Sequence, residues 1–461
     1  MSATGATLGE LDSAREATAD IGHILDEGPW TMMQIIVVAM AACSIIMDGF
    51  DGQLIGFAVP VLIKEWGVTR GDFALPLAAG LVGMGVGSAA AGLVADRFGR
   101  RLGIIASVFV FGIASGCIGF SQNLLTIGTL RFIAGLGIGG ALPTSTTMSA
   151  EYTPARWRTL AITVTIVCVP LGGMIAGLFA GFVLPNYGWR ALFFVGGPLA
   201  VCLAIALTLA LPESPRFLAR RPSRWPELAS LLGRIGRPTR PDARFTDLKE
   251  QKAEKHQGFP ALFREGRTRD TLALWCAFFL NLLAVYTAFT WLPAMLVSEG
   301  LNVGVASSGL TAYNFGGVIG ALLCAWAIAH LGSRWPMAFC ALGGAASAFS
   351  LEAVNVAQNA GLLIFGLGAH GLFVNATQSA QFAVSAHVYP TAVRATGTAS
   401  ALAFGRLGAI LSAFAGAAAI TAGGASAYLT MLGIAMTGVL IALLVLRRHI
   451  PSVRGGEVES G

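Results

Sequence analysis

The sequence predicts an all-α membrane protein with twelve transmembrane helices in two six-helix bundles. Three observations support this prediction: the composition, the spacing of the apolar runs, and a set of loop motifs that recurs in the second half. The 461 residues are 55% hydrophobic and only 12% charged, with 59 glycines, and the mean hydropathy is +0.71. This composition excludes a soluble globular domain and is typical of a polytopic helical membrane protein.

Each apolar run is about as long as the roughly 20 residues that a helix needs to cross a bilayer. In the first half the runs cover residues 32–60, 73–95, 103–121, 124–147, 159–184 and 190–211, and in the second half they cover residues 271–294, 305–331, 336–355, 359–386, 398–421 and 426–446. We therefore expect an N-terminal bundle over residues 31–211, a linker over 212–270 and a C-terminal bundle over 271–447, with tails over 1–30 and 448–461.

Lysine and arginine are concentrated in alternate short loops, and such basic loops face the cytoplasm. One set of loops and the C-terminal tail hold Arg97, Arg100, Arg101, Arg156, Arg158, Arg334, Arg394, Arg447 and Arg448, whereas the other set holds Lys64, Arg70 and Arg190. The first thirty residues lack the basic start and short apolar core of a signal peptide. The sequence thus predicts a multi-pass protein of the cell (inner) membrane with both termini in the cytoplasm.

The interval over residues 212–270 contains fourteen Lys or Arg, eight Asp or Glu and seven prolines. We interpret it as a solvated cytoplasmic linker with short helices, whose cations face the anionic inner leaflet; a patch for nucleic acid or lipid headgroups is the alternative. The net charge of +6 indicates no nucleic-acid partner, because the basic residues are spread over loops. The seven cysteines lie within apolar runs without metal-ligand spacing, so we expect no metal site and no cofactor.

The loops of the two halves resemble each other, which indicates an internal duplication. The loop over residues 92–101 is echoed at residues 327–334, and the loop over residues 151–158 is echoed at residues 389–394. Asp96 precedes His330 by 234 residues, and Pro154 precedes Pro390 by 236. This nearly constant offset at two separate loops predicts two pseudo-symmetric bundles.

Two aspartates lie deep in the first apolar run. Asp48 lies sixteen residues after Met32, and fifteen more residues precede Lys64, so acids that reach for water from a helix end are the weaker interpretation. A charged side chain at this depth costs about 2.5–3.5 kcal/mol on insertion scales. Because a three-residue spacing places both side chains on one helix face, we predict that Asp48 and Asp51 face a protein cavity.

Several motifs resemble those of a known transporter superfamily. The sequence GLVADRFGRR at residues 92–101 resembles the signature loop of the major facilitator superfamily, and PESPRFL at residues 212–218 resembles the segment that closes its sixth helix. The sequence DGFD at residues 48–51 is similar to the first helix of its aromatic acid:proton symporter family, and residues 131–143, 389–397 and 405–408 agree with that family. The resemblance covers about residues 30–446 and departs at His330, where the family usually has an acid.

This resemblance implies the major facilitator fold and a monomeric secondary transporter that imports a small aromatic carboxylate, such as 4-hydroxybenzoate, with protons by alternating access. Asp48 and Asp51 are the expected proton-coupling residues. Transport of another organic anion, such as a dicarboxylate or a nicotinate-like acid, and a transporter-like sensor of aromatic acids are the alternatives. The sequence has no zinc-ligand spacing, serine-elbow motif or Walker loop, so it does not indicate an enzyme.

Two arginines lie inside apolar runs. Arg131 is about seven residues into the fourth run and Arg406 about eight into the eleventh, and a guanidinium at that depth needs an anionic partner. We expect Arg131 to pair with Asp48 or Asp51, because the first and fourth helices both line the cavity in this superfamily, and to become a substrate-binding residue when protonation of the acid frees it. Arg406 has no evident acid on its own helix and is the predicted receptor for the substrate carboxylate, which matches its planar fork; a structural ion pair is the alternative.

Two further groups are predicted from residue type and position. Aromatic, amide and imidazole side chains in the seventh, eighth and tenth runs suit a hydroxylated ring; the substrate-binding candidates among them are Asn281, Tyr286, Tyr313, Asn314, His370 and Gln378. Charged residues at cytoplasmic helix ends can pair in one conformation and separate in another; the predicted gating residues are Asp96, Arg97, Arg100, Arg101, Glu151, Arg156, Arg158 and Arg394. Simple anchoring of the helix ends by arginine is the alternative.

Overall fold

The structure, a computed structural model, describes residues 18–240, 243–247, 259–264, 266–354, 359–390 and 393–452. The predicted tails before residue 18 and after residue 452 lie outside the described residues, as do linker residues 248–258. Almost all of the described chain is helical, and its short strands form one two-stranded sheet.

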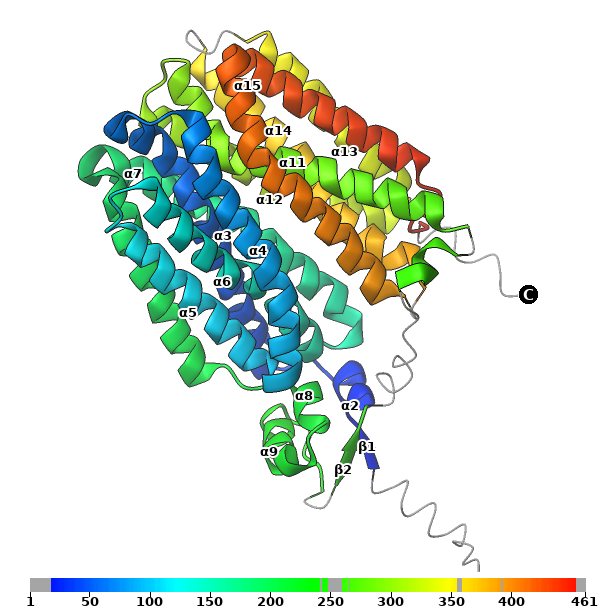
Figure 1. The fold of residues 1–461 in the computed structure, drawn as a ribbon. Coiled ribbons are helices and arrows are strands. Elements are labelled where there is room, and N and C mark those ends of the chain that lie inside the picture. The colour runs from blue at the N-terminus through cyan, green and yellow to red at the C-terminus, as the bar shows by residue number, and fades with distance from the viewer. Residues whose placement is uncertain are drawn as a thin grey trace, which may run out of the picture.

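The N-terminal half forms one bundle of membrane helices (Figure 1). Its elements are α3 (Met32–Trp66), α4 (Arg70–Phe98), α5 (Arg100–Ile118), α6 (Leu124–Tyr152) and α7 (Ala155–Ala210). The last of these contains two helices that meet at Gly188, whose φ of 75° interrupts the helical backbone. Glycine adopts this conformation at little cost, so the turn between the fifth and sixth helices forms there.

The C-terminal half forms the second bundle, with α11 (Thr268–Ser298), α12 (Val303–Leu331), α13 (Arg334–Glu352), α14 (Ala360–Val388) and α15 (Arg394–Val445). Non-helical backbone at Gly423 and Gly424 divides α15 into two helices. Nine described helices are long and apolar enough to cross a membrane. Counting both parts of α7 and of α15, and adding the 19-residue α13, gives the twelve predicted helices, six in each half.

The helices continue past several of the apolar runs that predicted them. For example, α3 extends to Trp66 and α6 extends to Tyr152, beyond the predicted ends at residues 60 and 147. Helical hydrogen bonds form equally well outside the hydrocarbon core, where a helix end can carry polar side chains such as Lys64 and Glu151. The apolar pattern therefore locates the membrane-embedded part of each helix better than its ends.

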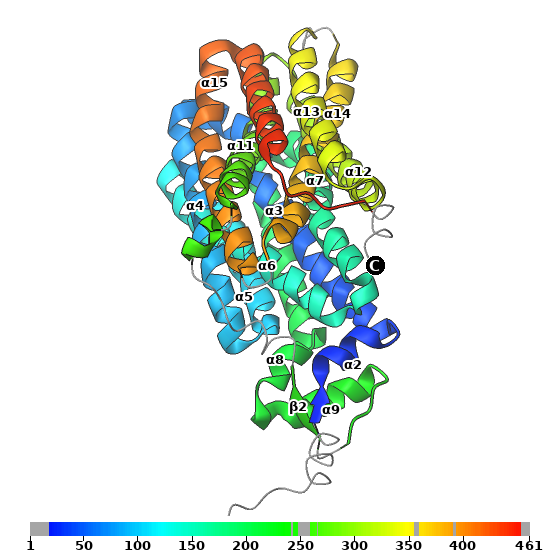
Figure 2. The same ribbon diagram turned by 90° about the vertical axis from the view of Figure 1, so that its right-hand side faces the viewer.

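The N-terminal segment and the linker pack together at one end of the molecule (Figure 2). Strand β1 (Thr18–Asp20) pairs in parallel with β2 (Arg244–Thr246), next to α2 (Ile21–Glu27), α8 (Pro215–Ala219) and α9 (Trp225–Arg234). Short 3-10 turns over Pro222–Arg224 and Phe259–Phe263 complete the described linker. The strands were not predicted, because three-residue strands are too short to show an alternating pattern. We call this the linker end of the molecule and the opposite end the far end.

A buried carboxylate ties the N-terminal segment to the linker and to the first bundle. Asp26 on α2 is 8% exposed and receives Arg158 of α7, and Arg216 of α8 lies 3.7 Å from the same oxygen. Arg216 also pairs with Asp247 at 3.0 Å, directly after β2. Arg237, after α9, donates to the backbone carbonyl of Ile24. The contacts of Arg216 with Asp26 and of Arg237 with Ile24 therefore join the linker to the N-terminal segment, which Arg158 joins to the first bundle.

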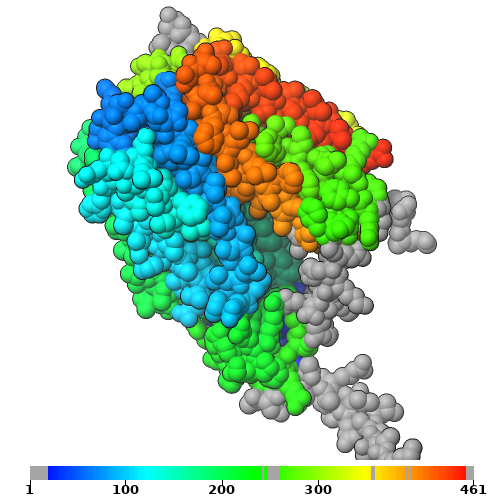
Figure 3. All heavy atoms as spheres, viewed as in Figure 1, coloured from blue at the N-terminus to red at the C-terminus, as the bar shows by residue number. Residues whose placement is uncertain are grey.

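The two bundles meet through α7 with α12, α4 with α15, and α3 with α11. Close contacts across this interface include Gly56 with Phe289 and Gly177 with Thr311. These residues lie toward the far end, where α3 and α11 finish and α12 begins. The space-filling view shows the bundles touching there, with a hollow between them nearer to α8 (Figure 3). The molecule is therefore closed at the far end.

Glycines allow helices within each bundle to touch along their backbones. A Cβ atom at Gly49 of α3 would lie 2.1 Å from the carbonyl oxygen of Val169 in α7, and one at Gly172 would lie 2.0 Å from that of Ile46. A similar contact joins α4 to α6. Helices in a membrane associate by such close packing rather than by the hydrophobic effect. The glycine beside Asp48 therefore fixes how that helix sits against α7.

We predict that Asp26→Asn loosens the N-terminal segment without unfolding the membrane helices. The change leaves Arg158 and Arg216 without their shared charge, and breaking a buried ion pair costs about 3–5 kcal/mol. Hydrogen–deuterium exchange should become faster over residues 18–27. The control is Glu27→Gln, since Glu27 is exposed and pairs only with exposed His23 among the ion pairs of the described residues. Equal exchange in the two variants would contradict the prediction.

We also predict that Gly49→Ala lowers the melting temperature of the purified protein. The new Cβ atom would overlap a backbone carbonyl that cannot rotate away, and overpacking of this kind costs about 1–3 kcal/mol. Gly52→Ala is the matched control on the same helix, because a Cβ atom there meets nothing within 4 Å. Thermal unfolding of both variants in one detergent makes the comparison, and equal melting temperatures would show that α3 and α7 have room to separate.

Candidate functional site

A cavity lies between the two bundles, with about 1050 Å³ of empty space when the open solvent at its mouth is included. Its walls come from α3, α4, α6 and α7 on one side and from α11, α14 and α15 on the other. Most of the lining is apolar, and the polar side chains that face it are Asp48, Gln53, Arg131, Tyr286, Thr290, Asn375, Gln378, Ser379 and Arg406. A mostly apolar cavity with a few placed polar groups is typical of a site for a small organic molecule.

The two aspartates of α3 occupy different positions. Asp48 lines the cavity and is 7% exposed. Asp51 is fully buried and faces α5, where its Oδ2 accepts a hydrogen bond of 2.7 Å from the hydroxyl of Ser115. Its Oδ1 has no hydrogen-bond partner among the described residues. Both acids therefore lie inside the protein, but only Asp48 is placed to meet a molecule in the cavity.

Arg131 lies close to these acids without forming an ion pair. This residue of α6 is 5% exposed, and its Nη2 donates to the carbonyl oxygen of Gly52 at 3.3 Å. It interacts electrostatically with Asp51, yet no ion pair within 4.0 Å joins it to an acid in the described part of the chain. Its Nε and Nη1 atoms have no hydrogen-bond partner there. The predicted pairing with Asp48 or Asp51 is thus reduced to a longer-range interaction with Asp51.

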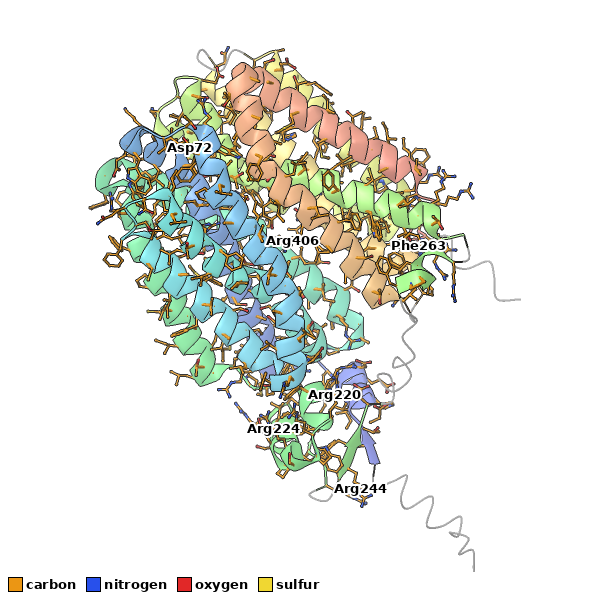
Figure 4. The ribbon with its side chains drawn as sticks, viewed as in Figure 1. Asp72, Arg220, Arg224, Arg244, Phe263 and Arg406 are labelled. Atoms are coloured by element: carbon orange, nitrogen blue, oxygen red, sulfur yellow. The ribbon has the colours of Figure 1, made fainter. Side chains whose placement is uncertain are left out.

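Arg406 reaches from α15 into the cavity at the boundary with the N-terminal bundle (Figure 4). Its Nη1 donates to the Tyr286 hydroxyl at 2.8 Å and lies 2.6 Å from the sulfur of Met84. Asp48 interacts with it electrostatically across the cavity, but no carboxylate of the described residues lies within ion-pair distance. Its Nε has no partner in that part of the chain. The guanidinium is therefore held in position with donors to spare.

The other predicted substrate-binding residues divide into two groups. Tyr286 and Gln378 line the cavity, whereas Asn281, Tyr313, Asn314 and His370 are buried outside its lining. The ring of Tyr313 lies between Phe289 and His370, and His370 Nδ1 lies 2.9 Å from the hydroxyl of Ser347. Asn314 forms hydrogen bonds with the side chain of Gln53. Direct contact of this second group with a substrate stays a prediction.

The cavity residues that sequence reasoning missed include Gln53, Ser379 and Met84. Gln53 follows Asp51 by two positions, and the cost of burying a polar group in the membrane, which singled out the acids, applies to an amide as well. Ser379 and Met84 carry no such signal, because serine and methionine are common in membrane helices. Among the described residues no group of three His, Cys, Asp or Glu side chains could hold a metal ion.

The predicted gating residues form a network at the linker end of the first bundle. Arg100 of α5 pairs with Asp96 of α4 at 2.7 Å, and its Nε lies 3.6 Å from Glu151 of α6. Ser214 of the linker donates to Glu151, and Glu213 accepts from the backbone of Arg101 at 3.1 Å. These contacts join three membrane helices to the start of the linker.

The remaining predicted gating residues also contact their own half of the molecule. Arg97 and Arg156 lie over the rings of Phe98 and Trp157, at 5.3 and 5.2 Å from their centroids. Arg158 binds Asp26, and Arg394 donates to the carbonyl oxygen of Tyr389 at 3.4 Å. No ion pair in the described part of the chain crosses between the bundles. Their role in gating stays a prediction.

The second bundle has a counterpart of this arrangement with different chemistry. The chain after α15 returns to the loop between α12 and α13, where Ser333 and Ile450 exchange backbone and side-chain hydrogen bonds of 2.9 and 2.8 Å. In the first bundle the segment after α7 contacts the loop between α4 and α5 in the same way. His330, at the position of Asp96, is exposed and contacts Trp326 of its own helix. The second bundle thus has no acid at the position of Asp96, and its ion pair among the described residues joins Arg448 to Asp270 at 3.7 Å.

Comparison with known proteins identifies the family. The model of the Major Facilitator Superfamily matches residues 41–312 and 274–460. The chain is 32% identical to the gallate transporter of Pseudomonas putida over 433 residues, which cover 93% of this chain and 95% of that protein. It is 32% identical to the 4-hydroxybenzoate transporter PcaK of Pseudomonas aeruginosa over 403 residues, or 86% of this chain and 89% of that one.

A solved structure agrees on the fold. The inward open conformation of the xylose transporter XylE from E. coli matches with a TM-score of 0.72 at 19% identity, covering 92% of this chain and 98% of that one. The relatives thus indicate the same family as the two pseudo-symmetric bundles and the charged loop between α4 and α5. The chain belongs to the major facilitator superfamily, among relatives that transport aromatic acids, and is a transporter rather than an enzyme.

Proposed function

We propose that this protein imports a small hydroxybenzoate-like carboxylate together with protons, by alternating access between its two bundles. The observation that carries the proposal is the pair of opposite charges across the cavity: Asp48 on α3 and Arg406 on α15 face the same space without forming an ion pair. An anion and a proton are the two ligands that such a pair accepts. The names of the gallate and 4-hydroxybenzoate relatives point to the same substrate class.

Arg406 is proposed to bind the substrate carboxylate. Its planar guanidinium can donate two parallel hydrogen bonds to a carboxylate, which gives both strength and orientation. Tyr286 holds the guanidinium by accepting one hydrogen bond from Nη1 of Arg406. The Nε of Arg406 has no partner among the described residues. A carboxylate at this point would satisfy donors that are otherwise buried without a partner, which costs about 1–3 kcal/mol per group.

The cavity walls next to Arg406 suit an aromatic ring with hydroxyl groups. Tyr286, Phe289 and Phe382 supply ring faces and edges from α11 and α14, and aromatic pairs add about 0.5–1.5 kcal/mol beyond the area that they bury. Gln378 and Ser379 line the same wall with an amide and a hydroxyl. These groups can accept or donate hydrogen bonds to ring hydroxyls on the side of the substrate away from its carboxylate.

Asp48 is proposed to couple transport to protons. A substrate carboxylate at Arg406 would place a second negative charge in the cavity that Asp48 lines, and two like charges repel strongly in a poorly solvated site. Protonation of Asp48 removes this repulsion, so that the proton and the anion each favour binding of the other. Asp51, out of the cavity behind Asp48, is proposed to tune this site through Arg131 and remains the second candidate for the titrating acid.

The linker end is proposed to face the cytoplasm. The arginine-rich loops lie at this end, and basic loops of membrane proteins face the cytoplasm. The hollow nearer to α8 then opens inward (Figure 3). The cytoplasmic bilayer surface is anionic and attracts juxtamembrane arginines such as Arg220, Arg221 and Arg224. In this orientation the structure corresponds to an inward-facing conformation, in which cargo is released to the cell.

We predict that Asp48→Asn abolishes accumulation driven by a pH gradient but preserves exchange of labelled for unlabelled substrate. The amide keeps the size of the side chain and mimics its protonated form, so binding survives while coupling is lost. Labelled 4-hydroxybenzoate uptake into proteoliposomes, acidic outside, measures both modes. Asp72→Asn is the control, because Asp72 is an exposed acid that caps α4 (Figure 4). If Asp51→Asn uncoupled transport while Asp48→Asn did not, the roles of the two acids would be reversed.

We predict that Arg406→Lys raises the KM for 4-hydroxybenzoate about 10- to 100-fold, the size expected when a hydrogen bond between charged groups is lost. Lysine keeps the charge but not the fork. Arg190→Lys is the control, since Arg190 pairs with Glu65 at 2.9 Å near the far end.

A panel of competitors that includes gallate, benzoate, nicotinate and succinate reports the substrate class. Binding without accumulation would instead indicate a sensor, and preference for succinate would indicate a dicarboxylate transporter.

A further inference from the structure

We infer that Gln53 and Asn314 form a reversible amide clasp that holds the far end of the cavity closed. Gln53 is on α3 in the first bundle and Asn314 is on α12 in the second. Gln53 Nε2 donates to Asn314 Oδ1 at 3.2 Å, and Asn314 Nδ2 donates to Gln53 Oε1 at 2.8 Å. The exposed fractions are 3% and 0%. Both amides are therefore shielded from water in this conformation.

The clasp is the main polar link between the bundles. Among the side-chain hydrogen bonds of the described residues, it alone joins nitrogen and oxygen atoms across the bundle interface. The other polar contacts across that interface run from Tyr286 and Arg406 to the sulfur of Met84, and sulfur is a weak acceptor. A reciprocal pair of amides also fixes the relative position of two helices, because both bonds form only in one alignment.

Close backbone contacts surround the clasp and seal the space beyond it. A Cβ atom at Gly173 of α7 would lie 2.1 Å from Gln53 Nε2, so the glycine leaves room for the amide. Nearer to the far end, a Cβ atom at Gly56 would lie 2.1 Å from the carbonyl oxygen of Phe289, and one at Gly177 would lie 2.0 Å from the hydroxyl of Thr311. The clasp thus lies between the cavity and a tightly packed plug.

The chemistry of the pair suits a link that must open in each transport cycle. When the bundles separate at the far end, each amide meets water, which replaces the lost hydrogen bonds at small net cost. An ion pair at the same place would leave two charges to be rehydrated and reburied at much larger cost. Two neutral hydrogen bonds can shift the equilibrium between the closed and open far end by roughly tenfold. The closed conformation is then favoured, but the open one stays accessible.

The clasp also connects the gate to the cargo site. Gln53 lines the cavity on the same helix as Asp48, five residues further on. Asn314, by contrast, is outside the cavity lining and also donates to the carbonyl oxygen of Leu310 in its own helix. A role in gating therefore fits Asn314 better than the substrate contact predicted from its residue type. The inference needs alternating access but does not depend on which anion is carried.

The test measures distances between spin labels in substrate-free protein. In a cysteine-free background, labels at Lys64 and Ser298 report the far end of the two bundles, and labels at the exposed Ala155 and Ala386 report the linker end. We expect Gln53→Met, which keeps the length of the side chain, to raise the far-end-open population roughly tenfold. The distance between the far-end labels should lengthen, and the distance between the linker-end labels should shorten.

A double-mutant cycle separates the clasp from general loss of packing. Asn314→Leu should give the same shift as Gln53→Met, and the double variant should add nothing further, because each single change already breaks both hydrogen bonds. The exchanged pair Gln53→Asn with Asn314→Gln should return the distances toward those of the original protein. Ser307→Ala is the control on α12, since the Ser307 hydroxyl is equally buried but bonds within its own helix.

Each of the following results would overturn the inference. Unchanged label distances in a well-folded Gln53→Met variant would show that the bundles stay together without the clasp. Additive shifts in the double variant, or an exchanged pair that behaves like the apolar one, would show that the two amides act independently. A changed KM for 4-hydroxybenzoate with unchanged distances would assign Gln53 to substrate binding instead. The distance measurements are independent of the substrate proposal, because they are made without any anion.

Discussion

A carboxylate and a guanidinium that face one cavity without touching are the feature on which the rest of the structure depends. Asp48 and Arg406 belong to different bundles, and neither forms an ion pair within 4.0 Å in the described part of the chain. Charges held in this way in a membrane are costly. The cost falls when a ligand supplies the missing partner, a proton for Asp48 and an anion for Arg406. Under the proposed function, the affinity of the cavity for a proton and an anion would come from these two groups, which lack an ion-pair partner in the described part of the chain.

Most hydrogen bonds and ion pairs of the described residues lie within one half of the molecule, and few join the two halves. Within each half, glycines bring helix backbones into contact, as at Gly49 and Gly172, and such packing transmits strain rather than absorbing it. Between the halves the polar contacts are few, and the described ion pairs stay within one bundle. The N-terminal segment and the linker as far as Asp247 are tied through Asp26 and Arg216 to the first bundle, so they are expected to move with it, whereas Phe259 and Phe263 pack against Trp275 of the second bundle. A rocking motion is the conformational change that this distribution of contacts favours.

Sequence patterns predicted the fold well because the membrane imposes simple rules. Helix number follows from the lengths of apolar runs, and the duplication follows from the offset of two loops. The acids and arginines were found because each is costly in lipid. The strands β1 and β2 carried no comparable signal. His330 contacts Trp326 of its own helix and does not form an ion pair with an arginine as Asp96 does, and this difference follows from a departure from the family pattern.

Sequence patterns predicted less well which side chains of each helix face the cavity. In a soluble protein an apolar stripe marks the buried face, but a membrane helix is apolar on its lipid face as well. Residue type alone therefore could not separate Gln378, which lines the cavity, from Asn281 and His370, which are buried within the second bundle. Nor could it show that Asn314 pairs with Gln53. These distinctions depend on the rotation of each helix, which tertiary packing decides.

The most direct test of the central claim is to count the protons taken up when the substrate binds. Calorimetric titration of the purified protein with 4-hydroxybenzoate, in buffers of different ionisation enthalpy, reports this number without any need for transport. If Asp48 and Arg406 act as described, the measured heat will depend on the buffer in the original protein and will not in Asp48→Asn. Heat that is the same in every buffer for the original protein, despite tight binding, would contradict the account.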